Sequence, residues 1–217
     1  MRRGSTTMVN IKICGVRSAE DARACVQLGA SSIGINFVPS SPRCVDLATA
    51  RSIADVAHEA NAKVVVVGVV ADLDLDAMRT LVRDAALDCL QLHGHEPAAT
   101  LASLLPHAYK AVRIANAADV ARARTYPGKH LLVDAKVEGA LGGTGATFDW
   151  TLVKDLARER QLTLAGGLVP ENVERAVREL RPYCVDVASG VEGDAKNAPG
   201  VKDLAKVRAF IEAARRG

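Results

Sequence analysis

The chain has 217 residues, which is long enough for one α/β barrel domain. Its composition, 49% hydrophobic and 24% charged, is typical of a folded globular protein and excludes a disordered chain. The net charge is only +3 and the basic residues are dispersed, which argues against a nucleic-acid partner. No apolar run approaches the roughly 18 residues of a membrane-spanning helix, so we expect no membrane partner.

The cysteine content indicates reduced thiols. The chain contains five cysteines, an odd number, with no CxxC pair and no spacing typical of a metal site. Disulfides are rare in the cytoplasm, so we expect free thiols, a cytoplasmic location and no bound metal. The five are Cys14, Cys25, Cys44, Cys89 and Cys184.

Residues 1–8 carry two arginines but lead into no apolar segment of the kind found in secretory signals. We expect this stretch to be a disordered N-terminal extension. Residues 9–217 contain no linker and no break in composition, which predicts a single domain over that range.

The first half of the chain alternates apolar runs with segments of helical periodicity. Ser18 is a good N-cap for the first helix and Gly29 a good stop signal. Asp72 or Asp74 starts the third helix, and Pro97 suits the first turn of the fourth. The other elements predicted in this half are strands at 9–13, 32–37, 62–70 and 88–92 and a second helix at Leu47–Ala60.

The second half continues the same alternation. Thr147 or Asp149 is a candidate N-cap for the sixth helix, and Pro170 fits the start of the seventh. The elements predicted in this half are strands at 107–114, 131–133, 162–165 and 184–188, a helix at Ala117–Arg124, and helices beginning at Asp149, Pro170 and Val201.

Strands that alternate with helices predict a parallel sheet. About eight such units in one chain favour a single closed (β/α)8 TIM barrel over an open doubly wound sheet. A flavodoxin-like sheet needs fewer units, and a dinucleotide-binding fold requires GxGxxG after the first strand, which the sequence lacks.

The stretch from residue 129 to 150 combines an apolar strand, Asp134 at its end and a glycine-rich loop. Gly142, Gly143 and Gly145 can expose backbone N–H groups to an anion because no Cβ intervenes. A carboxylic acid beside such a loop indicates acid chemistry on a phosphorylated substrate.

Active sites of (β/α)8 barrels lie at the C-terminal ends of the strands, and loops after the last two strands commonly bind phosphate. This rule brings together chemically active side chains and glycines that are far apart in the sequence. The predicted set is Cys14, Asn36, Arg43, His93, Asp134, Gly166, Gly167, Ser189 and Gly190.

Several of these residues have an ordinary interpretation as well. Cys14 by itself is better explained as a small buried hydrophobe than as a base, and its place at the strand end and within KICG reverses that preference. His93 either contacts substrate or hydrogen-bonds its own loop. Asp186 lies within the eighth strand, where a charge is costly unless paired, so we expect it to point inward and to orient another group. Lys12 points to the opposite side from its strand neighbours, and the sequence assigns it no duty toward Cys14.

Six motifs in order resemble the phosphoribosylanthranilate isomerase family of tryptophan biosynthesis over nearly the whole chain. Each motif is weak alone, and their order and intervals make the resemblance specific. They are KICGVRSAEDA, NFVPSSPR, LQLHGHE, GGTGATFDW, LAGGLVPENV and VDVASGVE.

The resemblance implies a catalytic barrel that performs an Amadori rearrangement, an aldose–ketose isomerisation of N-(5-phosphoribosyl)anthranilate, without metal or organic cofactor. It implies Cys14 as general base, Asp134 as general acid and Arg43 facing the anthranilate carboxylate. A small phosphosugar would be the ligand and the enzyme a monomer or homodimer. Substrate contacts would include His93 and Asp186, and the phosphate would rest near Gly145, Gly166, Gly167, Ser189 and Gly190.

Two other functions stay open on the sequence. A related barrel acting on another aminated sugar phosphate, such as a histidine-pathway isomerase, would be expected to use paired strand-end aspartates, whereas this chain has Cys14 and Asp134. A non-catalytic phosphosugar-binding barrel would be expected to lack one of those two residues and to keep the phosphate loops.

Overall fold

The computed structural model describes residues 8–134, 150–193 and 200–217. Its strands form one closed parallel barrel in the order β1 to β8, and β1 pairs with both β2 and β8. The predicted (β/α)8 fold is therefore confirmed. The strands are β1 Asn10–Cys14, β2 Ser32–Asn36, β3 Val65–Val70, β4 Cys89–Leu92, β5 Ala108–Arg113, β6 His130–Asp134, β7 Gln161–Ala165 and β8 Cys184–Val187.

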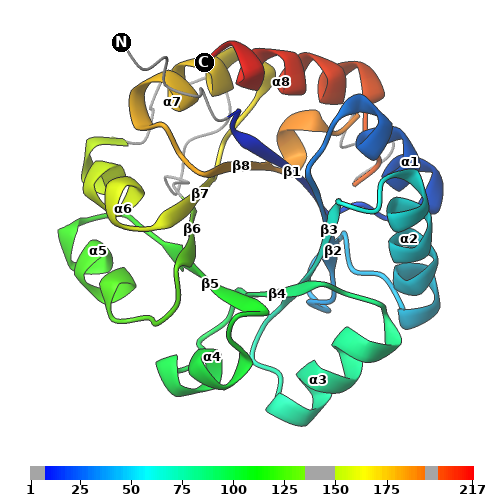
Figure 1. Ribbon diagram of the computed structural model, residues 1–217, viewed down its shortest axis with the longest axis horizontal. Helices are drawn as coiled ribbons and strands as arrows, with labels where there is room; N and C mark the ends of the chain where they lie inside the picture. The colour runs from blue at the N-terminus through cyan, green and yellow to red at the C-terminus, as the bar shows by residue number, and fades with distance from the viewer. Residues whose placement is uncertain (1–7, 135–149, 194–199) are drawn as a thin grey trace.

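Helices surround the strands as an outer ring (Figure 1). The helix α1 packs on α2, and α8 closes the ring by packing on both α7 and α1. The helices are α1 Ala19–Leu28, α2 Leu47–Ala60, α3 Leu75–Asp84, α4 Ala98–Leu104, α5 Ala117–Arg124, α6 Lys154–Glu159, α7 Pro170–Leu180 and α8 Leu204–Arg216, with short 3-10 helices η1 Trp150–Val153 and η2 Ser189–Val191.

Local capping signals were predicted well. The Ser18 side chain accepts a hydrogen bond from the Asp21 backbone N–H, and Gly29 ends α1 with φ of 107°. Of the two candidates for α3, Asp74 is the N-cap. These predictions succeed because a cap depends on a few consecutive residues and not on the rest of the fold.

Several predicted boundaries differ from the structure by one to three residues, and local hydrogen bonds explain two of these differences. β3 begins at Val65 and not at residue 62, since the Val64 N–H donates to the Asn61 carbonyl in a turn. Pro97 is the N-cap of α4 and not a residue of its first turn. α8 begins at Leu204 and not at Val201, because the Asp203 carboxylate caps the helix.

The predicted cap at Thr147 or Asp149 and the predicted helix start at Asp149 lie outside the described residues, as does most of the predicted N-terminal extension. The chain after this gap runs through η1 into α6.

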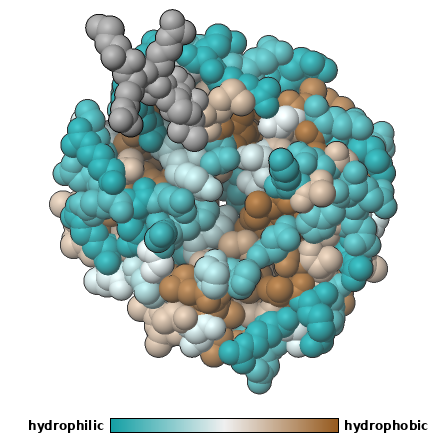
Figure 2. Space-filling model, in the orientation of Figure 1, coloured by the Kyte–Doolittle hydropathy of each residue, from teal (hydrophilic) through white to brown (hydrophobic). Residues whose placement is uncertain are grey.

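Successive side chains of each strand point to opposite faces of the barrel wall, so the buried apolar residues form two separate clusters. Odd-numbered β1 residues such as Ile11 and Ile13 join the large core between the strands and the helices. A smaller cluster of Val67, Tyr109 and Leu132 with its neighbours lies apart from that core, inside the barrel. Figure 2 shows hydrophilic residues over most of the outer ring, with paler and hydrophobic residues nearer its centre.

Candidate active site

A cavity of ≈ 370 Å³ lies at the C-terminal ends of the strands. It brings together every predicted site residue that the structure describes. Predicted Gly145 lies outside the described residues. The predicted residues in the lining are Cys14, Asn36, Arg43, His93, Asp134, Asp186, Gly166, Gly167, Ser189 and Gly190.

Cys14 is the last residue of β1, partly exposed to the cavity. Gly34 of the neighbouring strand provides the space for its side chain, since a Cβ there would lie 2.7 Å from Cys14 Sγ and 3.0 Å from Lys12 Cε. Burial raises the pKa of the Cys14 thiol, and the nearby Lys12 ammonium opposes this shift without cancelling it.

Lys12 lies inside the barrel, only 2% exposed. Its Nζ donates to Gln91 Oε1 at 2.7 Å, Asp186 Oδ2 at 3.0 Å and Cys14 Sγ at 3.4 Å. Burial by itself lowers the pKa of Lys12 most, but Asp186 and Cys14 outweigh it and the net pKa is raised well above its usual value. Lys12 is therefore a buried cation.

Asp186 points into the barrel as expected, 6% exposed, and its charge is paired with Lys12. Its second oxygen, Oδ1, is buried and has no hydrogen-bond partner in the structure. Buried carboxylate oxygens are normally satisfied, so Oδ1 is suited to accept a hydrogen bond from a hydroxyl group in the cavity.

Gln91 connects this cluster to His93. Its Oε1 accepts from Lys12 and from the Tyr109 hydroxyl, so its Nε2 is assigned as the donor to His93 Nδ1 at 3.1 Å. Burial lowers the pKa of His93. The lowered pKa favours the neutral imidazole, and with Nδ1 accepting from Gln91 the ring can offer Nε2–H to a group in the cavity.

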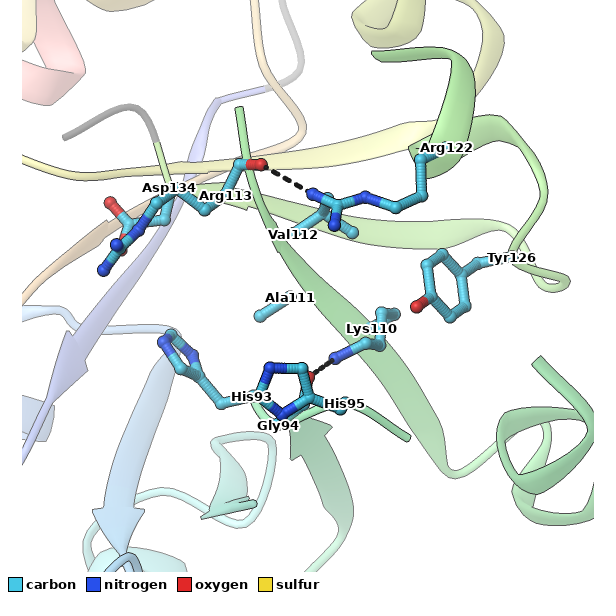
Figure 3. A pocket seen from close by; sticks show the side chains of 10 residues that line it. All are labelled: His93, Gly94, His95, Lys110, Ala111, Val112, Arg113, Arg122, Tyr126 and Asp134. Atoms are coloured by element: carbon cyan, nitrogen blue, oxygen red, sulfur yellow. Dashed lines mark hydrogen bonds between the residues drawn. The ribbon is translucent and has the colours of Figure 1, made fainter. Parts of the chain in front are cut away.

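Asp134 is the last residue of β6 and half-buried. It also lines a neighbouring cavity of ≈ 510 Å³ that His93 shares. In Figure 3 Asp134 and His93 lie on the same side of this second cavity, away from Arg122 and Tyr126. Asp134 can therefore reach a group at the junction of the two cavities.

Arg43 follows β2 and is held by Glu192. Its Nε and Nη2 donate to the two carboxylate oxygens of Glu192 at 2.5 and 2.7 Å. Lys202, whose side chain is fully buried, donates to Glu192 Oε1 at 3.1 Å and to the Ala188 carbonyl. Burial alone raises the pKa of Glu192, yet these two cations lower it overall.

The glycines at the ends of β7 and β8 bring two loops together. Gly166 and Gly167 have φ of 92° and 66°, a region that favours glycine. A Cβ on Gly190 would lie only 2.0 Å from the Leu168 carbonyl oxygen. Backbone groups of both loops therefore face one cavity, an arrangement suited to an anion such as phosphate.

The sequence assigns no role to four residues of the site: Lys12, Gly34, Gln91 and Glu192. Lys12 and Cys14 are two apart on a strand and therefore share a face, which was a usable signal. Glu192 stood in a recognised motif, but nothing local connects it with Arg43, 149 positions away. No group of three or more metal-ligating side chains and no helix able to span a membrane occurs in the described part of the chain.

Comparison with known proteins identifies the family of the chain. The family model of N-(5'-phosphoribosyl)anthranilate (PRA) isomerase matches residues 11–213. The N-(5'-phosphoribosyl)anthranilate isomerase of Myxococcus xanthus is 43% identical over 212 residues, covering 95% of this chain and 96% of that protein.

Solved structures are similar over the same range. The crystal structure of phosphoribosyl anthranilate isomerase from Thermotoga maritima superposes with a TM-score of 0.84 at 37% identity, covering 95% of this chain and 98% of that one. A complex of such an isomerase with reduced 1-(o-carboxyphenylamino)-1-deoxyribulose 5-phosphate has a TM-score of 0.81 at 35% identity, with the same coverage of both chains. The chain therefore belongs to the PRA isomerase family.

Proposed function

We propose that this chain isomerises N-(5-phosphoribosyl)anthranilate to 1-(2-carboxyphenylamino)-1-deoxyribulose 5-phosphate in tryptophan biosynthesis, with Cys14 as general base and Asp134 as general acid. Family membership supports the reaction. The observation that carries the assignment of roles is that a thiol on β1 and a carboxyl group on β6, strands that are not neighbours, line one cavity with the glycine loops.

The reaction needs two proton transfers, and each residue fits one. Asp134 protonates the furanose ring oxygen as its bond to C1 breaks, and the nitrogen lone pair forms a C1=N Schiff base. The Cys14 thiolate then removes the C2 proton, so that an S–H bond forms and the C–H electron pair makes an enaminol. Tautomerisation of the enaminol returns a proton to C1 and leaves the ketone at C2.

The remaining residues bind the substrate. Glu192 accepts hydrogen bonds from Nε and Nη2, which form one edge of the Arg43 guanidinium. The edge formed by Nη1 and Nη2 can bind the planar anthranilate carboxylate bidentately. The phosphate rests on the loops after β7 and β8, at Gly166, Gly167, Ser189 and Gly190, and the sequence motif adds Gly145 as a further candidate. Asp186 Oδ1 accepts from a ribose hydroxyl, and His93 donates through Nε2.

The direct test is the decay of anthranilate fluorescence when purified protein is added to phosphoribosylanthranilate. We expect turnover by the wild type and a loss of about 10²–10⁴-fold in kcat for Cys14→Ala and for Asp134→Asn. Cys44→Ala and Asp155→Asn are matched controls, since Cys44 donates to its neighbour's carbonyl and Asp155 pairs with Arg158 at the surface.

Each outcome is decisive. If the wild-type protein binds the phosphosugar without turning it over, the chain is a binding protein and not an enzyme. Full activity in Cys14→Ala or in Asp134→Asn would remove the corresponding role while leaving the reaction standing.

We further propose that residues 9–217 form the catalytic domain, that it acts as a monomer or homodimer, and that it needs no cofactor because side chains carry out both proton transfers. A similar structure is described as monomers generated from the dimeric isomerase of Thermotoga maritima. The five free cysteines support a cytoplasmic location. The molar mass of the purified chain, measured by analytical ultracentrifugation, would distinguish a monomer from a dimer.

A further inference from the structure

The Lys12 ammonium has a role beyond the acid, base and binding residues named so far. All three of its N–H groups are directed to acceptors on three strands: Cys14 on its own β1, Gln91 on β4 and Asp186 on β8. The register of β1 against β8 places Lys12 directly opposite Asp186. A long flexible side chain is thereby held in one position.

We propose that Lys12 is a positioning residue that supports Cys14 as a thiolate, by keeping a buried positive charge and an N–H donor at Sγ. This inference rests on the proposed role of Cys14 as the base. A thiolate is the reactive form of cysteine, and a neighbouring cation is what makes it accessible in a buried position.

The charges facing Cys14 are consistent with this role. Lys12 and Asp186 are paired and together contribute no net charge, while Arg43 and Lys202 share one carboxylate, Glu192. These five groups, three cations and two carboxylates, together carry one net positive charge that can meet a thiolate. The groups that interact electrostatically with Cys14 are Lys12, Arg43, Tyr109, Asp186 and Lys202. His93 and Asp134 line the same cavity, and Glu192 is the partner of Arg43 and Lys202.

Proximity distinguishes Lys12 from the other cations. It alone among the described residues donates a hydrogen bond to Cys14 Sγ, at 3.4 Å. Arg43 and Lys202 direct their donors to Glu192. Removal of the Lys12 charge should therefore raise the pKa of Cys14 further, on top of the rise caused by burial.

The experiment follows the rate of iodoacetamide alkylation of Cys14 against pH by peptide mass spectrometry, in wild type and in Lys12→Gln. Glutamine keeps a donor for Asp186 but removes the charge. We expect the pH midpoint of Cys14 alkylation to rise by about one unit or more, with a roughly tenfold slower rate below it. Cys44 in the same sample should keep its rate, and Lys63→Gln at the exposed surface should leave Cys14 unchanged.

An unchanged Cys14 midpoint in folded Lys12→Gln would overturn the proposal. If that variant does not fold, the wild type supplies the answer through the ¹³Cε chemical shift of Lys12. A step in that shift at the pH where Cys14 titrates, absent in Cys14→Ser, supports the contact, and no step refutes it. Alkylation needs no substrate, so a failure of the isomerase assay would leave this result intact.

Discussion

Arg43 and Glu192 form a two-point ion pair, with Nε to Oε1 at 2.5 Å and Nη2 to Oε2 at 2.7 Å. Glu192 is 5% exposed and also accepts from buried Lys202. Because the Lys202 ammonium donates as well to the Ala188 carbonyl, the pair connects the loop after β2 to the loop after β8. The proposed carboxylate-binding and phosphate-binding groups are thus held at a set distance.

We expect Glu192→Gln to raise KM for phosphoribosylanthranilate about tenfold and to change kcat little, because a neutral amide orients the Arg43 fork less strongly than a carboxylate. Steady-state fluorescence kinetics at a temperature where both proteins are folded measures this. Glu174→Gln, which removes a surface carboxylate paired with Arg178 and Arg216, is the control. An unaltered KM in Glu192→Gln would show that the pair has no part in substrate binding.

Gly34→Ala should lower kcat by about 10²-fold, since the new methyl group would displace Cys14 Sγ, 2.7 Å away, from the reacting carbon. Alanine at Gly193 is the control, because a Cβ there would meet only the Val201 carbonyl oxygen, 4.0 Å away. Kinetics and thermal unfolding should be measured together. Wild-type kcat in Gly34→Ala would mean that the thiol position is not critical.

The buried pair of Lys110 and Glu96 should matter for stability far more than a surface pair. Lys110 donates to Glu96 and to the carbonyls of Leu92 and Gly94, and so holds the loop that carries His93. We expect Glu96→Gln to cost about 3–5 kcal/mol in the free energy of unfolding, because it leaves a buried ammonium without its counter-charge.

The matched surface change is Glu59→Gln, which breaks an exposed pair with Arg23 and should cost below about 1 kcal/mol. Urea denaturation of both variants gives the comparison. Equal losses in the two variants would contradict the assignment of Lys110 and Glu96 as a structural pair.

His130 should make the barrel less stable in acid. Burial lowers its pKa to about 4, with further lowering from Lys12 and Arg160, and its ring stacks on Tyr109 at 4.0 Å and hydrogen-bonds Thr163. Between pH 6.5 and 4 the unfolded chain binds a proton that the folded chain does not. The free energy of unfolding should therefore fall as pH falls through this range, by about 3 kcal/mol in total.

Replacing His130 with glutamine removes the titrating group and should flatten that part of the pH dependence. Denaturation midpoints at pH 7 and pH 4.5 for wild type and His130→Gln provide the measurement. The same slope in both proteins would assign the acid sensitivity to other groups.

The sequence by itself determined the barrel and much of its local structure. Eight alternations of apolar run and amphipathic segment require a parallel sheet covered by helices, and Ser18 and Gly29 bound α1 through contacts with their own neighbours. The convergence of the strand-end residues also followed, because one rule of the fold places all C-terminal strand ends on one face. Cys14 and Asp134 are therefore identifiable as candidate site residues from the sequence.

Only the tertiary structure decided which groups touch. Lys12 meets Asp186 across 174 positions of chain, and Arg43 meets Glu192 across 149. Such pairs depend on strand register and on loop packing, for example on the close approach of Gly190 to Leu168. Register and loop packing are in turn fixed by the packing of the complete core and not by any one segment. Periodicity reports the face on which a side chain lies, whereas the partner it finds there is set by the closure of the barrel.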